Sequence, residues 1–231
     1  MPSLAVILAA LLLALPWAMR RRWRWGPHPL ARVAGRILVF FGLTAAAALL
    51  LAGRPEAAVR MPGEFAPAAV FAAVWTGIPF PVALPVSFLV LAMIGGGVVA
   101  GLIARVRRRE PMTLGDVSGM VPRRVSDLGW GALVSVVAGV GEELYFRLAL
   151  PLVLSLLGIG AIWAFVGSAL LFGWAHRYQG VLGITATAVI ALLLSATYLL
   201  TGQLWIATVL HVALDLNGLI VRPLVAGMIR R

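Results

Sequence analysis

The chain has 231 residues, of which 62% are hydrophobic and 12% are charged. Ordinary soluble domains hold about 45–50% apolar and about 25% charged residues, so this composition excludes a single soluble core. All nineteen basic residues behind the net charge of +11 are arginines, and no cysteine is present, which excludes disulfides and thiolate metal sites.

Long apolar runs predict an all-α fold, a polytopic transmembrane helical bundle with seven to eight spans. The first spans are expected at about 4–19, 37–51 and 82–104. Glycine and prolines break segment 66–80, which we interpret as re-entrant or interfacial; if it crosses, the count is eight. Further spans are expected at about 128–157, 161–175, 181–200 and 204–221, joined by short links that force antiparallel neighbours.

The arginines cluster beside apolar runs, at Arg20–Arg24, Arg105–Arg109 and Arg123–Arg124. This is typical of the cytoplasmic flanks of transmembrane helices and argues against nucleic-acid binding. The blocks predict an external N-terminus and a cytoplasmic C-terminus. The expected regions are 1–127, with N-terminal helices and a cytoplasmic loop, the core 128–221, and a cytoplasmic tail 222–231.

Ionisable residues inside the predicted spans are concentrated in this core. They are Glu142, Glu143, Arg147, His211 and Asp215, with His176 at a span end. Such a group costs about 2.5–3.5 kcal/mol at mid-bilayer, so each is a functional hypothesis.

Helical spacing relates these residues to one another. Glu143 and Arg147 are four residues apart and can pair. Glu142 is rotated by about 100° from Glu143 and can face another target. His211 and Asp215 share one helix face. Peptide hydrolysis needs an activated water, a proton donor and a partner for the oxyanion, which are roles that glutamate and histidine can fill.

Three motifs in this order resemble the CPBP family of intramembrane proteases, which includes type II CAAX prenyl endopeptidases and Abi-like bacteriocin-processing proteins. They are Glu142-Glu143-Leu-Tyr-Phe-Arg147 (E-E-x-x-x-R), Phe172-Gly-Trp-Ala-His176 (F-x-x-x-H) and His211-Val-Ala-Leu-Asp215 (H-x-x-x-N/D). The resemblance covers about 128–221, which it implies is a catalytic core.

The resemblance implies a role for each motif residue. Glu142 and His176 would activate water, and His211 with Asp215 would form the oxyanion side. Glu143, Arg147 and Phe172 would support the site. The third motif often ends in asparagine, so Asp215 either donates in protonated form or accepts the ring N–H of His211.

Several alternatives stay open at this point. The same polar groups could serve a non-catalytic immunity or binding protein, or an ion pathway. The same residues could also have purely structural roles. Glu142, Glu143 and Arg147 could form an ion-pair cluster, His176 could be a solvated residue at the membrane interface, and His211 with Asp215 could be a hydrogen-bonded pair that joins helices. We expect no cofactor. A zinc site would use His176, His211 and either Glu142 or Asp215, but no H-E-x-x-H helix is present.

The resemblance and the composition together predict an intramembrane endopeptidase. Its expected partners are membrane lipid and a peptide or lipidated protein substrate, with no nucleic acid. The protein is expected to be an integral, multi-pass protein of the plasma (inner) membrane of a bacterium.

Overall fold

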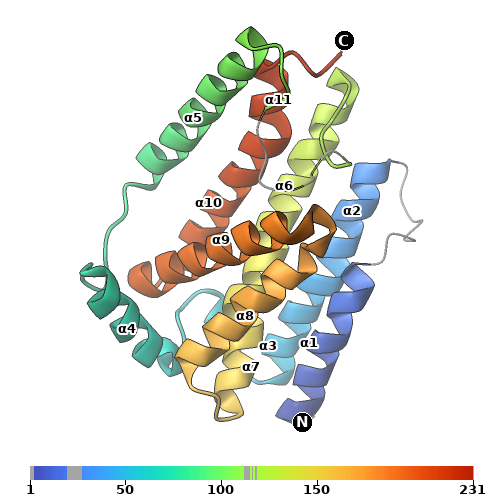
Figure 1. Cartoon of the computed structure of the whole chain (residues 1–231). Helices are drawn as coiled ribbons and strands as arrows, with labels where there is room; N and C mark the ends of the chain where they lie inside the picture. The colour runs from blue at the N-terminus through green and yellow to red at the C-terminus, as the bar shows by residue number, and fades with distance from the viewer. Residues whose placement is uncertain (1–2, 20–27, 112–114, 116, 118, 231) are drawn as a thin grey trace.

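The computed structural model of the chain describes residues 3–19, 28–111, 115, 117 and 119–230. Within these residues the regular structure is helical, and the only β-type pairing is an isolated parallel bridge between Arg124 and Arg230. The all-α helical bundle is therefore confirmed (Figure 1).

The helices form long rods, three of which contain a π-helical turn. In the N-terminal half, α1 (Leu4–Ala18) is followed by a rod that consists of α2 (Pro29–Ile37), a π-helical turn (Leu38–Leu43) and α3 (Thr44–Leu51). Helices α4 (Ala66–Thr76) and α5 (Val86–Val106) come next. The C-terminal half begins with a rod that consists of α6 (Leu128–Glu143), a π-helical turn (Leu144–Ala149) and α7 (Leu150–Leu156). Helices α8 (Ala161–Ala175) and α9 (Gly180–Thr201) follow. The last rod consists of α10 (Leu204–Leu216), a π-helical turn (Asn217–Val221) and α11 (Arg222–Val225).

Four described helices are long and apolar enough to cross a membrane, which indicates an integral membrane protein. They are Pro29–Leu51, Val86–Val106, Arg177–Thr201 and Leu204–Val225. Helices α1 and α8 are apolar but shorter. The rod 128–156 carries three charged residues near its middle. The count of seven to eight spans stays a prediction.

Three helix boundaries differ from the expected ones. Helix α2 begins at Pro29 rather than near residue 37, because His28 Nδ1 accepts a hydrogen bond from the N–H of Leu30 at 3.2 Å and a proline suits the first turn. Helix α5 begins after Pro85 rather than near residue 82. The last rod continues beyond residue 221 to Val225, so the expected tail begins inside a helix.

Helix α4 is the proline-bounded piece that was expected to be short. It has 11 residues and ends at Gly77, whose positive φ of 69° suits glycine. Its length is about 16 Å, against a hydrocarbon core of roughly 30 Å. Its re-entrant or interfacial placement stays a prediction.

The arginine-rich segments that the structure describes gather at one end of the bundle. Figure 1 places the end of α5, the start of α6 and the C-terminus at this end, and the N-terminus at the other. Arg105–Arg109, Arg123–Arg124 and Arg222 belong to these parts. The block Arg20–Arg24 lies outside the described residues. The position of these segments at one end agrees with the expected topology. Which side of the membrane this end faces stays a prediction.

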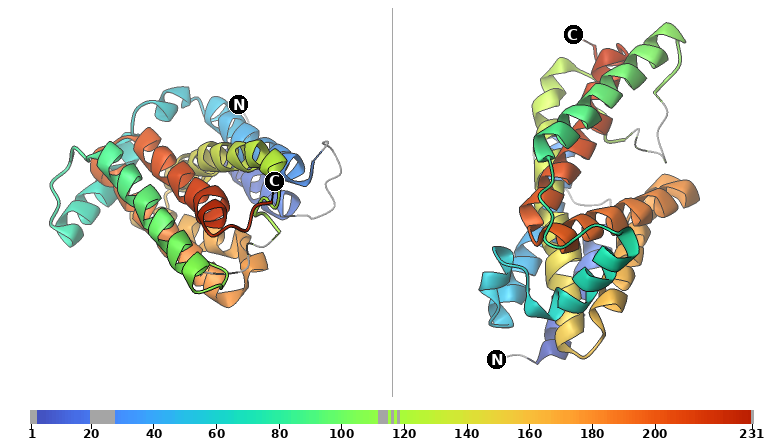
Figure 2. Two further views of the ribbon diagram at one scale, coloured as in Figure 1. Left: turned by 90° about the horizontal axis from the view of Figure 1, so that it is seen from above. Right: turned by 90° about the vertical axis from the view of Figure 1, so that its left-hand side faces the viewer.

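Helix α5 lies at the edge of the bundle, alongside α10 and α11 (Figure 2). Asn217 Nδ2 donates to the carbonyl oxygen of Met93 at 2.8 Å. A Cβ at Gly97 would lie 1.6 Å from Asn217 Oδ1, so the close approach requires glycine. This contact fixes α5 against the rod that carries the third motif.

The rod 128–156 is the central element that positions the polar core. Helix α6 packs against α2 and α10, and the π-turn after it packs against α3 and α8. Tyr145 and Phe146 within this π-turn contact Phe41 at ring distances of 5.0 and 5.2 Å. Phe146 also meets Phe172 edge-on at 5.0 Å. Close packing on every side places the first motif in the interior.

Candidate active site

The first motif lies where the central rod changes from an α-helix to a π-helical turn. Glu142 and Glu143 are the last residues of α6, and Arg147 lies inside the turn Leu144–Ala149. All three side chains are buried, and Glu143 and Arg147 are 0% exposed. Because π-helical turns inside α-helices often mark functional sites, the local distortion itself points to this segment.

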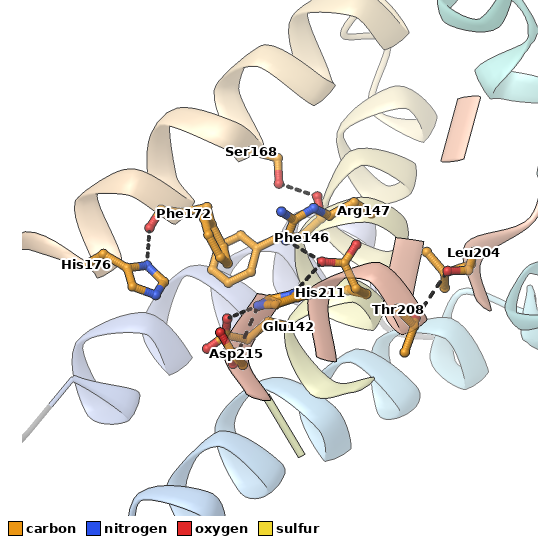
Figure 3. Close-up of polar contacts among 11 residues, drawn as sticks. Glu142, Phe146, Arg147, Ser168, Phe172, His176, Leu204, Thr208, His211 and Asp215 are labelled. Carbon is orange, nitrogen blue, oxygen red and sulfur yellow. Dashed lines mark hydrogen bonds and ion pairs between the residues drawn. The ribbon is translucent and has the colours of Figure 1, made fainter. Parts of the chain in front are cut away.

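His211 lies between the two adjacent glutamates, with one ring nitrogen toward each. Its Nδ1 is 2.7 Å from Glu143 Oε1, and its Nε2 is 3.8 Å from Glu142 Oε2 (Figure 3). An ionised carboxylate only accepts, so we assign the Nδ1 proton to a hydrogen bond donated to Glu143. The rotation between neighbouring helix positions lets the glutamates reach opposite sides of one imidazole.

Arg147 balances part of the negative charge of this cluster. Its Nη1 lies 3.0 Å from Glu143 Oε1, the same oxygen that binds His211. The guanidinium carbon is 4.4 Å from the centre of the Phe172 ring, within the range of a cation–π contact. The pairing of Glu143 with Arg147 expected from their spacing is therefore present.

Asp215 lies on the more open side of His211. Its Oδ2 is 3.9 Å from His211 Nε2, which is beyond hydrogen-bond length, and its side chain is 32% exposed. Of the two roles left open for Asp215, acceptance of a ring N–H of His211 is absent from this arrangement, and donation in protonated form stays a prediction. The ring hydrogen bond that is present joins Nδ1 to Glu143, on the other side of the imidazole.

His176 lies at the end of α8, and Phe172 fixes its orientation. His176 Nδ1 is 2.8 Å from the carbonyl oxygen of Phe172, and the two rings are 4.5 Å apart. The same Phe172 ring lies 6.0 Å from the ring of His211. In the view of Figure 3, the second nitrogen of His176 points toward the side of Glu142 and Asp215. The structure therefore brings all the predicted motif residues to one region.

The candidate zinc ligands His176, His211, Glu142 and Asp215 all lie in this region. No group of three or more His, Cys, Asp or Glu side chains among them is placed to hold a metal ion. His211 Nδ1 bonds Glu143 and His176 Nδ1 faces a backbone carbonyl, so Nε2 is the nitrogen of each ring that could bind a metal. A tetrahedral site would need the remaining nitrogens and a carboxylate to converge on one point at about 2 Å.

Tyr178 is a neighbour of the site that sequence reasoning missed. It is the middle residue of the turn Arg177–Gln179, which joins α8 to α9, and its ring lies 5.8 Å from the ring of His176. Its position two residues after the motif histidine was the available signal. The π-helical turn was missed as well, because hydrophobic spacing does not distinguish one π turn from α-helix.

A comparison with known families identifies the core of the chain. Residues 124–217 match the model of the family described as type II CAAX prenyl endopeptidase Rce1-like. The match contains all three motifs and confirms the resemblance predicted from them. Searches of curated proteins and of solved structures found no match to the chain.

Proposed function

We propose that this chain, whose residues 124–217 fall within the Rce1-like type II CAAX prenyl endopeptidase family, hydrolyses a peptide bond at the cluster around His211. The family supports an intramembrane protease of the CAAX type, and the apolar helices indicate an integral membrane protein. The substrate is proposed to be a membrane-associated or lipidated protein tail, and the location the plasma membrane of a bacterium.

The observation that carries the proposal is the placement of Glu142 beside His211. Glu142 Oε2 and His211 Nε2 are 3.8 Å apart, too far for a direct hydrogen bond, so the two groups can act on neighbouring atoms of one substrate. A base for the attacking water beside a hydrogen-bond donor for the oxyanion is what peptide hydrolysis requires. Burial of both side chains strengthens each electrostatic contact there.

The proposed reaction uses Glu142 as the general base. Glu142 takes a proton from water while the water oxygen bonds to the carbonyl carbon and the carbonyl oxygen becomes an oxyanion. The C–N bond then breaks, and the Glu142 carboxyl returns the proton to the leaving amine. The proposed role of His176 is to orient the attacking water from the opposite side.

His211 and, in its protonated form, Asp215 are proposed to stabilise the oxyanion by donating hydrogen bonds to it. In its protonated form His211 donates from Nδ1 to Glu143 and from Nε2 toward the oxyanion. Glu143 and Arg147 act as positioning residues, because they hold the imidazole without facing the reacting atoms. No step needs a metal, and the bound-metal content of purified active protein, with and without chelation, tests this part.

Replacement of Glu142 tests the proposed base. Glu142→Gln keeps the shape of the side chain, and we expect kcat to fall at least about a hundredfold, since positioned bases contribute roughly 10²–10⁴. Cleavage would be measured on a panel of prenylated, acylated and unmodified membrane peptides. Glu56→Gln is the matched control, because it makes the same change on a 60% exposed side chain far along the sequence from the site.

The result separates an enzyme from a binding or ion-conducting protein. Full activity of Glu142→Gln on a peptide that the wild type cleaves would remove Glu142 as the base. If the wild type cleaves no peptide of the panel but binds one of them, the proposed endopeptidase is wrong and the alternative of a non-catalytic binding protein takes its place.

A further inference from the structure

Tyr178 lies at the outer edge of the candidate site, on the short turn Arg177–Gln179. It is 43% exposed, in contrast to the buried Glu142 and His211. Its ring packs at 5.8 Å and 35° against His176. A peptide approaching Glu142 along the His176 side therefore passes this side chain.

The hydroxyl of Tyr178 is held by one good partner and one weak one. Gln179 Nε2 donates to the hydroxyl oxygen at 3.1 Å, which fixes the position of that oxygen. The hydroxyl itself donates to the thioether sulfur of Met120 at 3.5 Å. Thioether sulfur is a weak acceptor, so a peptide carbonyl would compete successfully for this proton.

We propose that Tyr178 is a further substrate-binding residue, whose hydroxyl exchanges Met120 for a backbone carbonyl of the bound peptide next to the scissile bond. This rests on the proposed endopeptidase function. The phenol then anchors the substrate chain beside His176, while Gln179 keeps the hydroxyl oriented. A backbone acceptor makes the contact independent of the side chains of the substrate.

The substitution Tyr178→Phe tests the hydroxyl and keeps the ring that packs on His176. We expect kcat/KM to fall roughly three- to tenfold, the range of one net hydrogen bond, with an unchanged unfolding temperature. Met120→Leu is the matched control, since it removes the sulfur and keeps the volume. We expect it to leave kcat/KM equal to wild type or higher, because the competing acceptor is gone.

A substrate series identifies the atom that is bound. Peptides in which single carbonyls next to the scissile bond are reduced to methylene would be cleaved by the wild type and by Tyr178→Phe. At one position the difference between the two proteins should disappear, because the contacted carbonyl is absent. A constant difference at every position would overturn a contact with a backbone carbonyl.

Two other outcomes would also overturn the proposal. Wild-type kcat/KM in Tyr178→Phe would show that only the ring matters, and an equal loss in Met120→Leu would show that the hydroxyl serves to hold residue 120. Either result leaves the endopeptidase in place if Glu142→Gln is inactive. Conversely, full activity of Glu142→Gln would contradict the assigned mechanism. A loss of substrate binding in Tyr178→Phe would still support the role proposed for Tyr178.

Discussion

Two arginine–glutamate clusters of this protein lie in opposite surroundings. Arg54 contacts Glu56 at 3.0 Å and both carboxylate oxygens of Glu64 at 2.6 and 2.8 Å, and the Arg54 and Glu64 side chains are 28% and 27% exposed. Arg147 is fully buried and meets Glu143 through Nη1 alone. Among the described residues, no hydrogen-bond acceptor lies at its Nε or Nη2.

We expect this difference between an ion pair that serves the fold and one that serves the proposed active site. The partly exposed cluster around Arg54 has satisfied geometry, and its contribution to the free energy of unfolding is small because its groups remain in contact with water. The buried cluster retains polar groups without protein partners, which is costly in an apolar interior. Such a cost is tolerated at membrane depth where the groups have a function. Substitutions in the two clusters and at Asp215 can break or sharpen this comparison.

The largest effect is expected from Glu143, which holds both Arg147 and His211. Glu143→Gln leaves the buried guanidinium without a counter-charge, so we expect a loss of roughly 3–5 kcal/mol in the free energy of unfolding. Activity should fall together with stability, because His211 loses its anionic partner. Unfolding in detergent and kcat on the best peptide of the panel measure the two effects.

The double variant Glu143→Gln/Arg147→Met separates the two roles of this residue. Removal of both charges should restore much of the stability, since the unpaired buried charge is gone. Activity should stay low, because the imidazole is still held by a neutral amide. Recovery of both quantities together would show that Glu143 only supports the fold.

A smaller effect is expected at Asp215, which is partly exposed. Asp215 lies 3.9 Å from His211 Nε2, so its charge does not orient the ring through a hydrogen bond. We expect Asp215→Asn to keep kcat within about fivefold, the range of a weak ion pair. Asp215→Ala removes the polar group and should cost roughly a hundredfold if it contacts the oxyanion. Equal losses in the two variants would show that the charge itself is required.

The smallest effect is expected in the exposed cluster. Arg54→Gln should lower the free energy of unfolding by about 1 kcal/mol or less and leave kcat unchanged. The hydrogen bond from Arg54 lowers the pKa of Glu64, so this contribution is present above the ordinary carboxyl pKa and is lost as pH falls through the lowered one. Unfolding temperatures of wild type and variant should therefore differ at neutral pH and converge in acid.

An equally large stability loss for Arg54→Gln and Glu143→Gln would contradict the comparison. In that case burial would not distinguish the two clusters, and the buried polar groups would need no functional explanation.

Much of this architecture could be predicted because it depends on local pattern. Apolar runs give helices, and the glycine at Gly202, with φ 70°, ends α9 two residues before α10 begins. The start of α2 was missed, because its first turns read as polar sequence and its cap uses a histidine. The spacing of Glu143 and Arg147 was sufficient to predict their contact, since both lie on one helical segment.

By itself, the sequence determined the helical class, the short links and the membership of the polar cluster. The identity of the partners of His211 was decided only by tertiary structure. Helical periodicity states which residues share a face, but it leaves open how α6 and α10 are rotated about their axes when they pack. That rotation placed Glu143 at hydrogen-bond distance from His211 Nδ1 and left Asp215 3.9 Å from Nε2. Tertiary structure also brought together Met120 and Tyr178, which are 58 residues apart in the chain.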